Sequence, residues 1–193
     1  MKITEPIRCK EEINALVAYY RNRGNMRNFV LIVLCLYTAL RSCDILRLTW
    51  DDVYDFKRGR IRKSISIQEK KTKKTKIIAL NAEVKKALKL FLFAAEPGRF
   101  LIENRQTHKA LSRCQAYRIV RAASEAIAMQ KHCSCHSLRK TFGYHAYKSG
   151  TPLLLIMRIY NHSSIAVTER YLGITQDDID AVYNAINYVR AAD

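Results

Sequence analysis

Residues 132–141 read HCSCHSLRKT, and two incompatible folds can be built on this stretch. One is a zinc-centred fold, because histidine and cysteine are the ligands of structural zinc sites, here His132, Cys133, Cys135 and His136. The other uses His136-x-x-Arg139, an imidazole and a guanidinium that suit a bound anion. Zinc ligands usually come as two separated pairs, and one contiguous backbone segment does not easily surround a tetrahedral ion. The anion interpretation is therefore favoured, with a zinc protein as the alternative.

The local pattern around this motif predicts a helix. Ser137 is a good N-cap, so we expect a helix over residues 137–149 with Arg139 in its first turn. A helix N-terminus offers free N–H groups and the positive end of its dipole to a phosphate. The pattern H-x-x-R alone occurs often by chance, so its meaning depends on the rest of the chain.

The charge balance favours a polyanionic partner. The 193 residues contain 34 Lys and Arg against 17 Asp and Glu, which gives a formal net charge of +17. Such an excess is most often found in nucleic-acid-binding proteins, although a basic balance can also serve solubility alone. The length favours one domain that buries roughly 70% of its unfolded surface.

Cysteine usage and hydropathy favour a reducing cytoplasm. Six cysteines lie at positions 9, 35, 43, 114, 133 and 135, and those in apolar or helix-like patterns read as buried hydrophobic residues rather than disulfide partners. The N-terminus has no apolar signal region, and the longest apolar run, residues 29–36, is too short to span a membrane.

Periodicity predicts a mainly α architecture with one small three-stranded antiparallel β-sheet. Residues 25–40 are apolar nearly all round, which indicates a central helix. The other expected helices cover about 10–20, 44–48, 81–93, 112–129, 152–160, 164–172 and 177–189, and the expected strands cover 53–54, 61–67 and 76–80.

Two further stretches place cations where they need a partner. Residues 38–50, TALRSCDILRLTW, put Arg41 where a buried helix ends, and Asp44 could orient it. A purely structural Arg41–Asp44 pair is the alternative. Residues 69–76, EKKTKKTK, are either a solvated charge run or a flexible turn that carries an ammonium into a DNA groove.

The last stretch supplies a candidate nucleophile. Residues 161–171 read NHSSIAVTERY, in which Ser163 or Ser164 can cap a helix. His162 precedes that helix, and Tyr171 lies about two turns along it.

The four stretches together resemble the catalytic domain of the tyrosine recombinases, or phage integrase family, over residues of about 5 to 190. The shared pattern is Thr-x-Leu-Arg-x-x-Asp-Ile-Leu-x-Leu-x-Trp, a lysine hairpin, His-x-Leu-Arg-x-Thr-Phe and His-Ser-Ser-x-x-x-Thr-x-x-Tyr, in this order. The resemblance implies a catalytic set of Arg41, Lys71, His136, Arg139, His162 and Tyr171. Lys70 or Lys73 takes the place of Lys71 if the hairpin register slips.

The chain departs from the family pattern in its turns and its length. Ala39 stands where the family usually has Gly, and Lys73 replaces the glycine of the hairpin turn. Before the second histidine, the dipeptide Tyr160-Asn161 replaces the usual Leu-Gly. Asn tolerates the left-handed conformation, so that turn can survive. Family members usually carry an N-terminal helical domain, and we expect one catalytic domain over residues 1–193 without that core-binding domain.

The implied reaction is the attack of Tyr171 on a DNA phosphodiester, which gives a 3′-phosphotyrosyl link and a free 5′-hydroxyl, followed by strand transfer without ATP, metal or cofactor. Arg41 and Arg139 suit the phosphate because a guanidinium fork matches two oxygens and stays charged. The resemblance assigns His136 as base, Lys71 as proton donor to the 5′ oxygen, and His162 as a hydrogen-bond donor to the phosphate.

The expected partner is double-stranded DNA, with self-association through the C-terminal helix over about 177–189, in cis or in trans. Two other DNA proteins fit parts of the pattern: a type IB topoisomerase with the same chemistry, and a non-catalytic DNA-binding module.

Overall fold

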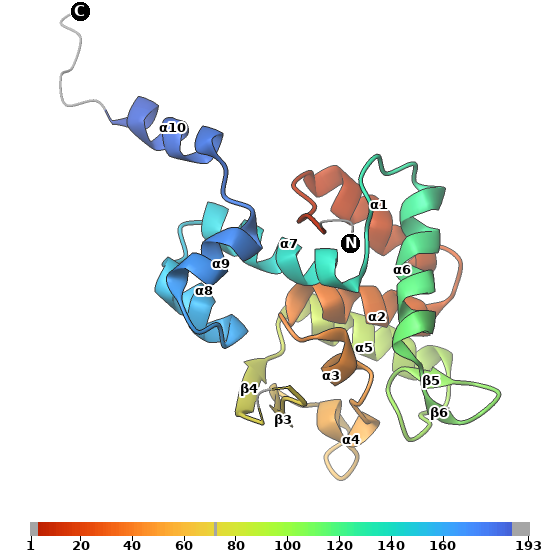
Figure 1. Cartoon of the computed structure of the whole chain (residues 1–193). Helices are drawn as coiled ribbons and strands as arrows, with labels where there is room; N and C mark the ends of the chain where they lie inside the picture. The colour runs from red at the N-terminus through yellow and green to blue at the C-terminus, as the bar shows by residue number, and fades with distance from the viewer. Residues whose placement is uncertain (1–3, 72, 187–193) are drawn as a thin grey trace, which may run out of the picture.

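A computed structural model of the chain describes residues 4–71 and 73–186. These residues are mostly helical (Figure 1), as the sequence predicts. The helices in the larger, central part of the molecule are α1 (Lys10–Arg21), α2 (Met26–Tyr37), α3 (Ser42–Ile45), α4 (Trp50–Val53), α5 (Ala82–Ala94), α6 (Arg113–Ala126) and α7 (Cys135–Lys148). Three more follow: α8 (Leu153–Tyr160), α9 (Ile165–Leu172) and α10 (Gln176–Ala185).

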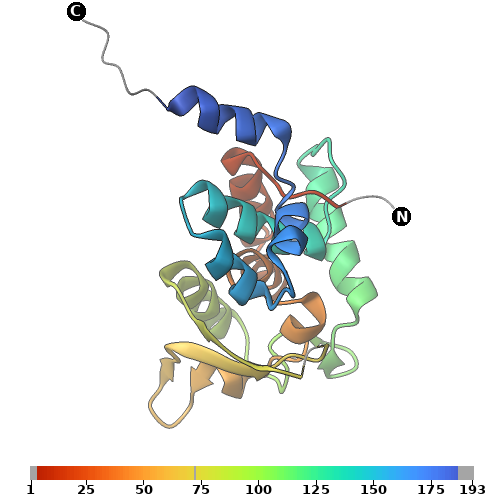
Figure 2. The same cartoon turned by 60° about the vertical axis from the view of Figure 1, so that its left-hand side comes forward.

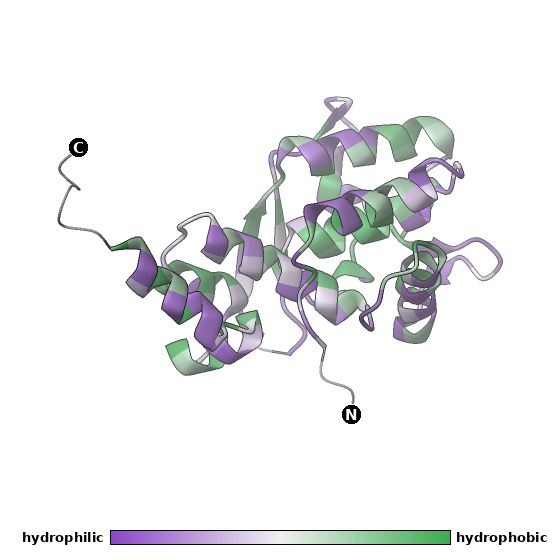
Figure 3. Cartoon of the chain, turned by 90° about the horizontal axis from the view of Figure 1, so that it is seen from above, coloured by the Kyte–Doolittle hydropathy of each residue, from purple (hydrophilic) through white to green (hydrophobic). Residues whose placement is uncertain are grey.

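The main core is built around α2, in which every residue from Asn28 to Leu36 is buried. A helix that is apolar on all sides is stable only where neighbours cover each face. α1, α5, α6 and α7 pack against it (Figures 1 and 2), so the predicted central helix is confirmed. The surrounding helices mix hydrophilic and hydrophobic residues along their length (Figure 3).

Several helices begin at the N-cap residues that the sequence indicated. Asn81 accepts from the Val84 N–H at 2.9 Å and begins α5. Ser112 and Ser164 cap α6 and α9, and Thr175 forms a capping box at the start of α10. The predicted helix over 177–189 therefore begins slightly earlier, and its last three positions lie outside the described residues.

The start of α7 differs from the prediction that Ser137 is its N-cap. The cap is Ser134, whose side chain accepts from the Ser137 N–H, while the Ser137 hydroxyl accepts from the Ser134 N–H at 3.2 Å. Two serines three positions apart form a reciprocal capping box, so the N-cap lies three residues earlier than predicted and the helix begins at Cys135. As a consequence, Arg139 lies in the second turn and not in the first.

The strands form separate hairpins and not one three-stranded sheet. The run 61–67 changes partner in its middle, because the Arg62 N–H donates to Val53 O while the Lys63 carbonyl accepts from the Leu80 N–H. A hairpin over residues 103–110 was not expected. The resulting antiparallel pairs are β1 (Tyr54–Asp55) with β2 (Arg60–Ile61), β3 (Ser64–Gln68) with β4 (Thr75–Ala79), and β5 (Glu103–Asn104) with β6 (Lys109–Ala110).

A second, smaller core joins α7, α8 and α9 on one side of the molecule (Figure 1). Its buried members are Ala39, Ile156, Tyr160 and Leu172. Gly143 in α7 allows this packing, because a Cβ at that position would lie 2.5 Å from the Tyr160 hydroxyl oxygen. α10 then leaves the body of the molecule (Figures 1 and 2).

The length and hydropathy of the described helices differ from those of membrane-spanning segments. None of the helices within residues 4–186 combines the length and apolar character that a bilayer crossing requires.

Candidate active site

Two of the predicted residues are in direct contact. The Arg139 Nε donates to the Tyr171 hydroxyl at 3.1 Å, so α7 and α9 bring together residues that lie 32 positions apart. A further Arg139 nitrogen, Nη2, donates to the Tyr160 carbonyl at 3.4 Å, and the guanidinium carbon lies 4.8 Å from the centre of the Tyr160 ring. Arg139 is only 2% exposed, yet its Nη1 has no hydrogen-bond partner among the described residues.

Both predicted histidines flank the same tyrosine. The ring centres of His136 and Tyr171 are 5.1 Å apart in an edge-on arrangement, and those of His162 and Tyr171 are 4.9 Å apart. His162 is held by a 3.1 Å contact between its Nδ1 and the Thr168 hydroxyl and by stacking on Tyr160. Asn161, just before it, has φ of 54°, so the expected left-handed turn is confirmed.

The surroundings keep both imidazoles neutral near pH 7. Burial lowers the pKa of His136 to about 4, with further contributions from Lys140, Arg139 and Arg41. Burial together with Arg139 and Arg41 also lowers the pKa of His162 to about 4. A neutral imidazole is able to accept a proton, as a general base must.

The Tyr171 hydroxyl is protonated in the resting site. Burial raises its pKa, while Arg139 and Arg41 act in the opposite direction. The hydroxyl therefore requires a base before it can act as a nucleophile at neutral pH.

Arg41 is oriented by a carboxylate that the sequence did not indicate. Its Nη1 lies 2.9 Å from Glu69 Oε1, so Asp44 is not the partner that was expected. Asp44 is fully buried and accepts the Lys70 N–H at 2.9 Å, which fixes the start of the hairpin turn. Ala39 has φ of 53° in the loop before Arg41, which explains why glycine suits that position.

Among the hairpin lysines, Lys71 is exposed, whereas Lys76 on β4 reaches the site. The Lys76 Nζ donates to the Ile159 carbonyl at 2.6 Å. Burial lowers the pKa of Lys76 to about 8, and Arg139 and Arg41 add to this while Glu69 and Asp44 oppose it. The sequence contained an indication that Lys76 faces inward, because residues two apart on a strand share a face and Ile78 is buried.

The two cysteines of the zinc interpretation pack against the main core, while its two histidines lie beside different tyrosines. Cys133 is 2% exposed in the main core, where burial raises the pKa of its thiol to about 12. Cys135 also packs against that core, while His132 lies beside Tyr117. Within residues 4–71 and 73–186, no three His, Cys, Asp or Glu side chains are grouped as metal ligands would be. The zinc interpretation therefore loses its geometric basis.

The family is decided by comparison with known proteins. The model of the phage integrase family matches residues 9–178. The chain belongs to the phage integrase family. It is 36% identical over 183 residues to the probable integrase/recombinase YoeC of Bacillus subtilis (strain 168), a match that covers 95% of this chain and 97% of YoeC. The predicted family membership is thereby confirmed.

Solved structures of phage integrase family members share the fold. The crystal structure of XerA recombinase aligns with a TM-score of 0.76 at 19% identity, over 97% of this chain and 66% of that one. The XerH site-specific recombinase, in a post-cleavage complex with palindromic difH substrate, aligns with a TM-score of 0.74 at 20% identity. This alignment covers 95% of the present chain and 54% of the XerH chain. The chain thus spans between about half and two thirds of these two recombinases.

Proposed function

We propose that this chain is a site-specific DNA recombinase or integrase in which Tyr171 is the nucleophile. The observation that carries the proposal is the buried Arg139, which contacts the Tyr171 hydroxyl and keeps one nitrogen without a partner among the described residues. A buried guanidinium needs an anion, and a phosphodiester that meets Nη1 would lie next to the tyrosine oxygen. Membership of the phage integrase family supports a recombinase over a topoisomerase or a non-catalytic module.

The reaction is a transesterification. A bond forms between the Tyr171 oxygen and phosphorus while the bond between phosphorus and the 5′ oxygen breaks. His136 takes the phenol proton, since its ring lies beside Tyr171 and is neutral near pH 7. A lysine ammonium gives a proton to the departing 5′ oxygen, and the 5′-hydroxyl of a second DNA end reverses the attack. Because one ester replaces another, no ATP is needed.

The cations stabilise the transition state. Negative charge increases on the non-bridging phosphate oxygens, and Arg41 and Arg139 are fixed donors for those oxygens. His162 donates a hydrogen bond to the phosphate. The loss of one preorganised donor typically slows such a reaction on the order of 10²- to 10³-fold.

The tyrosine assignment is tested by trapping the covalent product. The substrate is a pool of random-sequence duplexes in which sulfur replaces one bridging 5′ oxygen, because the released thiol does not reverse the reaction. We expect DNA that survives detergent on the wild-type protein and on Tyr147→Phe, and none on Tyr171→Phe. A covalent adduct on Tyr171→Phe would refute the assignment, and sequencing of the trapped DNA would give the target.

The same sulfur substrate identifies the proton donor among the hairpin lysines. A thiolate leaves without a proton, so a variant that lacks the donor should cleave the oxygen ester slowly and the sulfur ester at the wild-type rate. The resemblance favours Lys71, whereas burial beside Arg139 and Arg41 favours Lys76. Lys71→Met and Lys76→Met distinguish the two, and a rate defect on both substrates would remove that lysine from the role.

Double-stranded DNA as the partner is tested by salt. The net charge of +17 predicts an affinity that falls steeply as salt rises. The logarithm of the affinity should fall with the logarithm of salt at about −0.9 per phosphate neutralised. A flat profile would contradict binding to the duplex.

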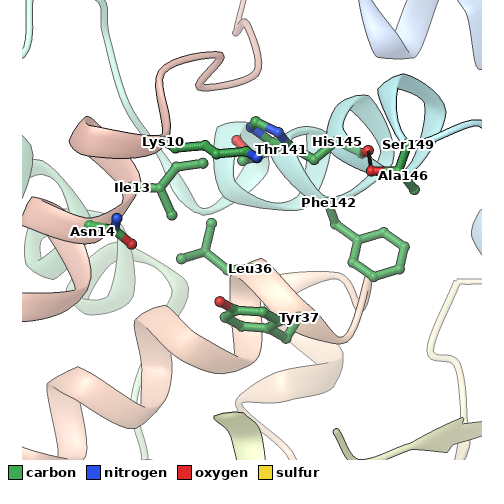
Figure 4. A pocket seen from close by; sticks show the side chains of 10 residues that line it. All are labelled: Lys10, Ile13, Asn14, Leu36, Tyr37, Thr141, Phe142, His145, Ala146 and Ser149. Atoms are coloured by element: carbon green, nitrogen blue, oxygen red, sulfur yellow. Dashed lines mark hydrogen bonds between the residues drawn. The ribbon is translucent and has the colours of Figure 1, made fainter. Parts of the chain in front are cut away.

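We also propose self-association through α10. None of its residues is buried, and three apolar side chains on one face, Ile179, Val182 and Tyr183, are 45–75% exposed. Ile186, which follows the helix directly, is 53% exposed. α1, α2 and α7 line an open pocket of about 420 Å³ whose walls combine apolar and polar side chains, shown in Figure 4. Ile13, Leu36 and Phe142 are among the residues that line it. An α10 from a second copy is our candidate for its occupant.

The test places a charge on either face of α10. Val182→Lys should lower the solution mass of the protein–DNA assembly, whereas Asn184→Lys adds the same charge to the polar face and should leave the mass unchanged. Equal masses for both variants would contradict the role of the apolar face.

A further inference from the structure

A buried carboxylate that the reaction does not use lies at the centre of the candidate site. Glu69 is 0% exposed. Its Oε1 accepts from Arg41 Nη1 at 2.9 Å, and its Oε2 accepts from Asn161 Nδ2 at 2.7 Å. A fully buried carboxylate with charge-assisted bonds is a rigid connection, because each bond is strong where water is excluded.

The two bonds join three parts of the chain that carry the reaction. Arg41 ends the loop after α2, Glu69 follows the last residue of β3, and Asn161 forms the left-handed turn between α8 and α9. His162 follows that turn directly. The separations in sequence are 28 and 92 residues, so no local hydrogen bonding could hold these segments together.

Glu69 also changes the charge balance among the cations. It lies close enough to Lys76 to oppose the lowering of the lysine pKa that Arg139 and Arg41 cause. Without a carboxylate there, Arg41, Arg139 and Lys76 would repel one another in a low-dielectric site. The Arg41 Nη1 bonds Glu69, and a guanidinium carries further N–H donors that can meet a phosphate.

We propose that Glu69 is a positioning residue that acts through Arg41 and Asn161. It fixes one end of the Arg41 guanidinium so that the other end faces the phosphate, and it locks the turn that presents His162. This inference rests on the proposed recombinase function, since it concerns how that site is aligned.

The main variant is Glu69→Gln, which keeps the size of the side chain but removes its charge. Gln has one acceptor oxygen where Glu has two, so the bond from Arg41 loses its ionic character even where the Asn161 amide turns to accept from the new N–H. Asn161→Gly removes the second bond outright and keeps a residue that accepts positive φ. Glu103→Gln is the matched control, because Glu103 is also largely shielded and hydrogen-bonded but lies in the β5–β6 hairpin.

Single-turnover cleavage at saturating protein and DNA affinity are measured separately on the trapped target. We expect Glu69→Gln to slow cleavage on the order of 10- to 100-fold, as small misplacements of catalytic groups do. DNA affinity should not weaken, and Glu103→Gln should cleave at the wild-type rate. A wild-type rate in Glu69→Gln overturns the proposal, while an inactive wild-type protein would instead refute the proposed function.

A double variant separates positioning from a merely structural role. Arg41→Ala leaves Glu69 acting through Asn161 alone, so adding Glu69→Gln should slow Arg41→Ala by much less than it slows the wild type. A defect as large as in the wild-type background overturns action through Arg41. Should Glu69→Gln fail to fold, Asn161→Gly decides: slower cleavage at unchanged affinity supports the proposal, and an unchanged rate overturns it.

Discussion

Replacing Arg139 should make the protein more stable and inactive at once. Arg139 is 2% exposed, and no carboxylate forms an ion pair with it among the described residues. It also lowers the pKa of Lys76, so its charge is unfavourable to that ammonium before DNA binds. Arg139→Met removes this charge and keeps a long unbranched side chain.

The magnitude follows from the contacts that the substitution removes. The burial of an uncompensated ion costs several kcal/mol. Against this stand about 1.5–3 kcal/mol for the charge-assisted hydrogen bond from Nε to the Tyr171 hydroxyl, the longer 3.4 Å bond from Nη2 to the Tyr160 carbonyl, and the contact with the Tyr160 ring. We therefore expect Arg139→Met to raise the free energy of unfolding by up to about 1 kcal/mol, or Tm by up to roughly 4 °C for a chain of this size.

Thermal unfolding with and without sulfate tests the reasoning. An anion that binds the folded state raises Tm by mass action, so sulfate should stabilise the wild-type protein more than Arg139→Met. Arg158→Met removes an exposed arginine from α8 and should change stability by no more than about 0.5 kcal/mol. If Arg139→Met is less stable than the wild type by more than about 1 kcal/mol, the guanidinium is compensated in the free protein and the reasoning fails.

Three further predictions concern pH and backbone geometry. The folded pKa of His136 is about 4, below its ordinary 6.5, so the base stays neutral as the pH falls from 7.5 to 5.5. We therefore expect kcat/KM for cleavage to show no decline centred on pH 6.5 in this range. A decline of that kind would exclude His136 in this state as the base. Gly143→Ala should lower the free energy of unfolding in urea by about 1–3 kcal/mol or more, because the new Cβ would lie 2.5 Å from the Tyr160 hydroxyl oxygen; full stability would mean that the α7–α8 contact is not tight. Lys73→Gly should raise the free energy of unfolding, because φ of 58° strains any residue with a Cβ. The gain should stay below about 1 kcal/mol, because glycine loses more backbone entropy on folding. Lys74 has no positive φ, so the control Lys74→Gly should give no gain.

The sequence predicted the parts of the fold that depend on local chemistry. The all-round apolar pattern of α2 and the caps Asn81 and Ser112 each follow from one segment of the chain, and Ser164 is one of the two caps predicted for α9. The start of α7 was misplaced because Ser134 and Ser137 are both good caps, and only their reciprocal bonding selects the first. The run 61–67 was predicted as one strand because a change of hydrogen-bond partner leaves no mark on hydropathy.

The candidate site was predictable only where the residue type carries the signal. Arg139, Tyr171 and the two histidines meet as their motifs indicate. Glu69 was hidden within a run of lysines, and its burial depends on the pairing of β3 with β4 and on segments 28 and 92 residues away. Charge in a sequence indicates solvent exposure on average, so a buried carboxylate in such a run is found only from three-dimensional contacts.

The distribution of charge among the described residues shows how the folded site can keep a buried cation that has no anionic partner there before DNA binds. Glu69 pairs with Arg41, whereas Arg139 forms no ion pair with a carboxylate within residues 4–71 and 73–186. The helix that carries Arg139 is fixed independently of charge, because the Tyr160 hydroxyl donates to the Arg139 carbonyl at 2.6 Å and packs closely on Gly143. The packing of the small core therefore holds the cation in place at a cost in stability. In the proposed function, a phosphodiester that reaches Nη1 would remove this cost, so binding energy and alignment of the Tyr171 hydroxyl would come from the same contact.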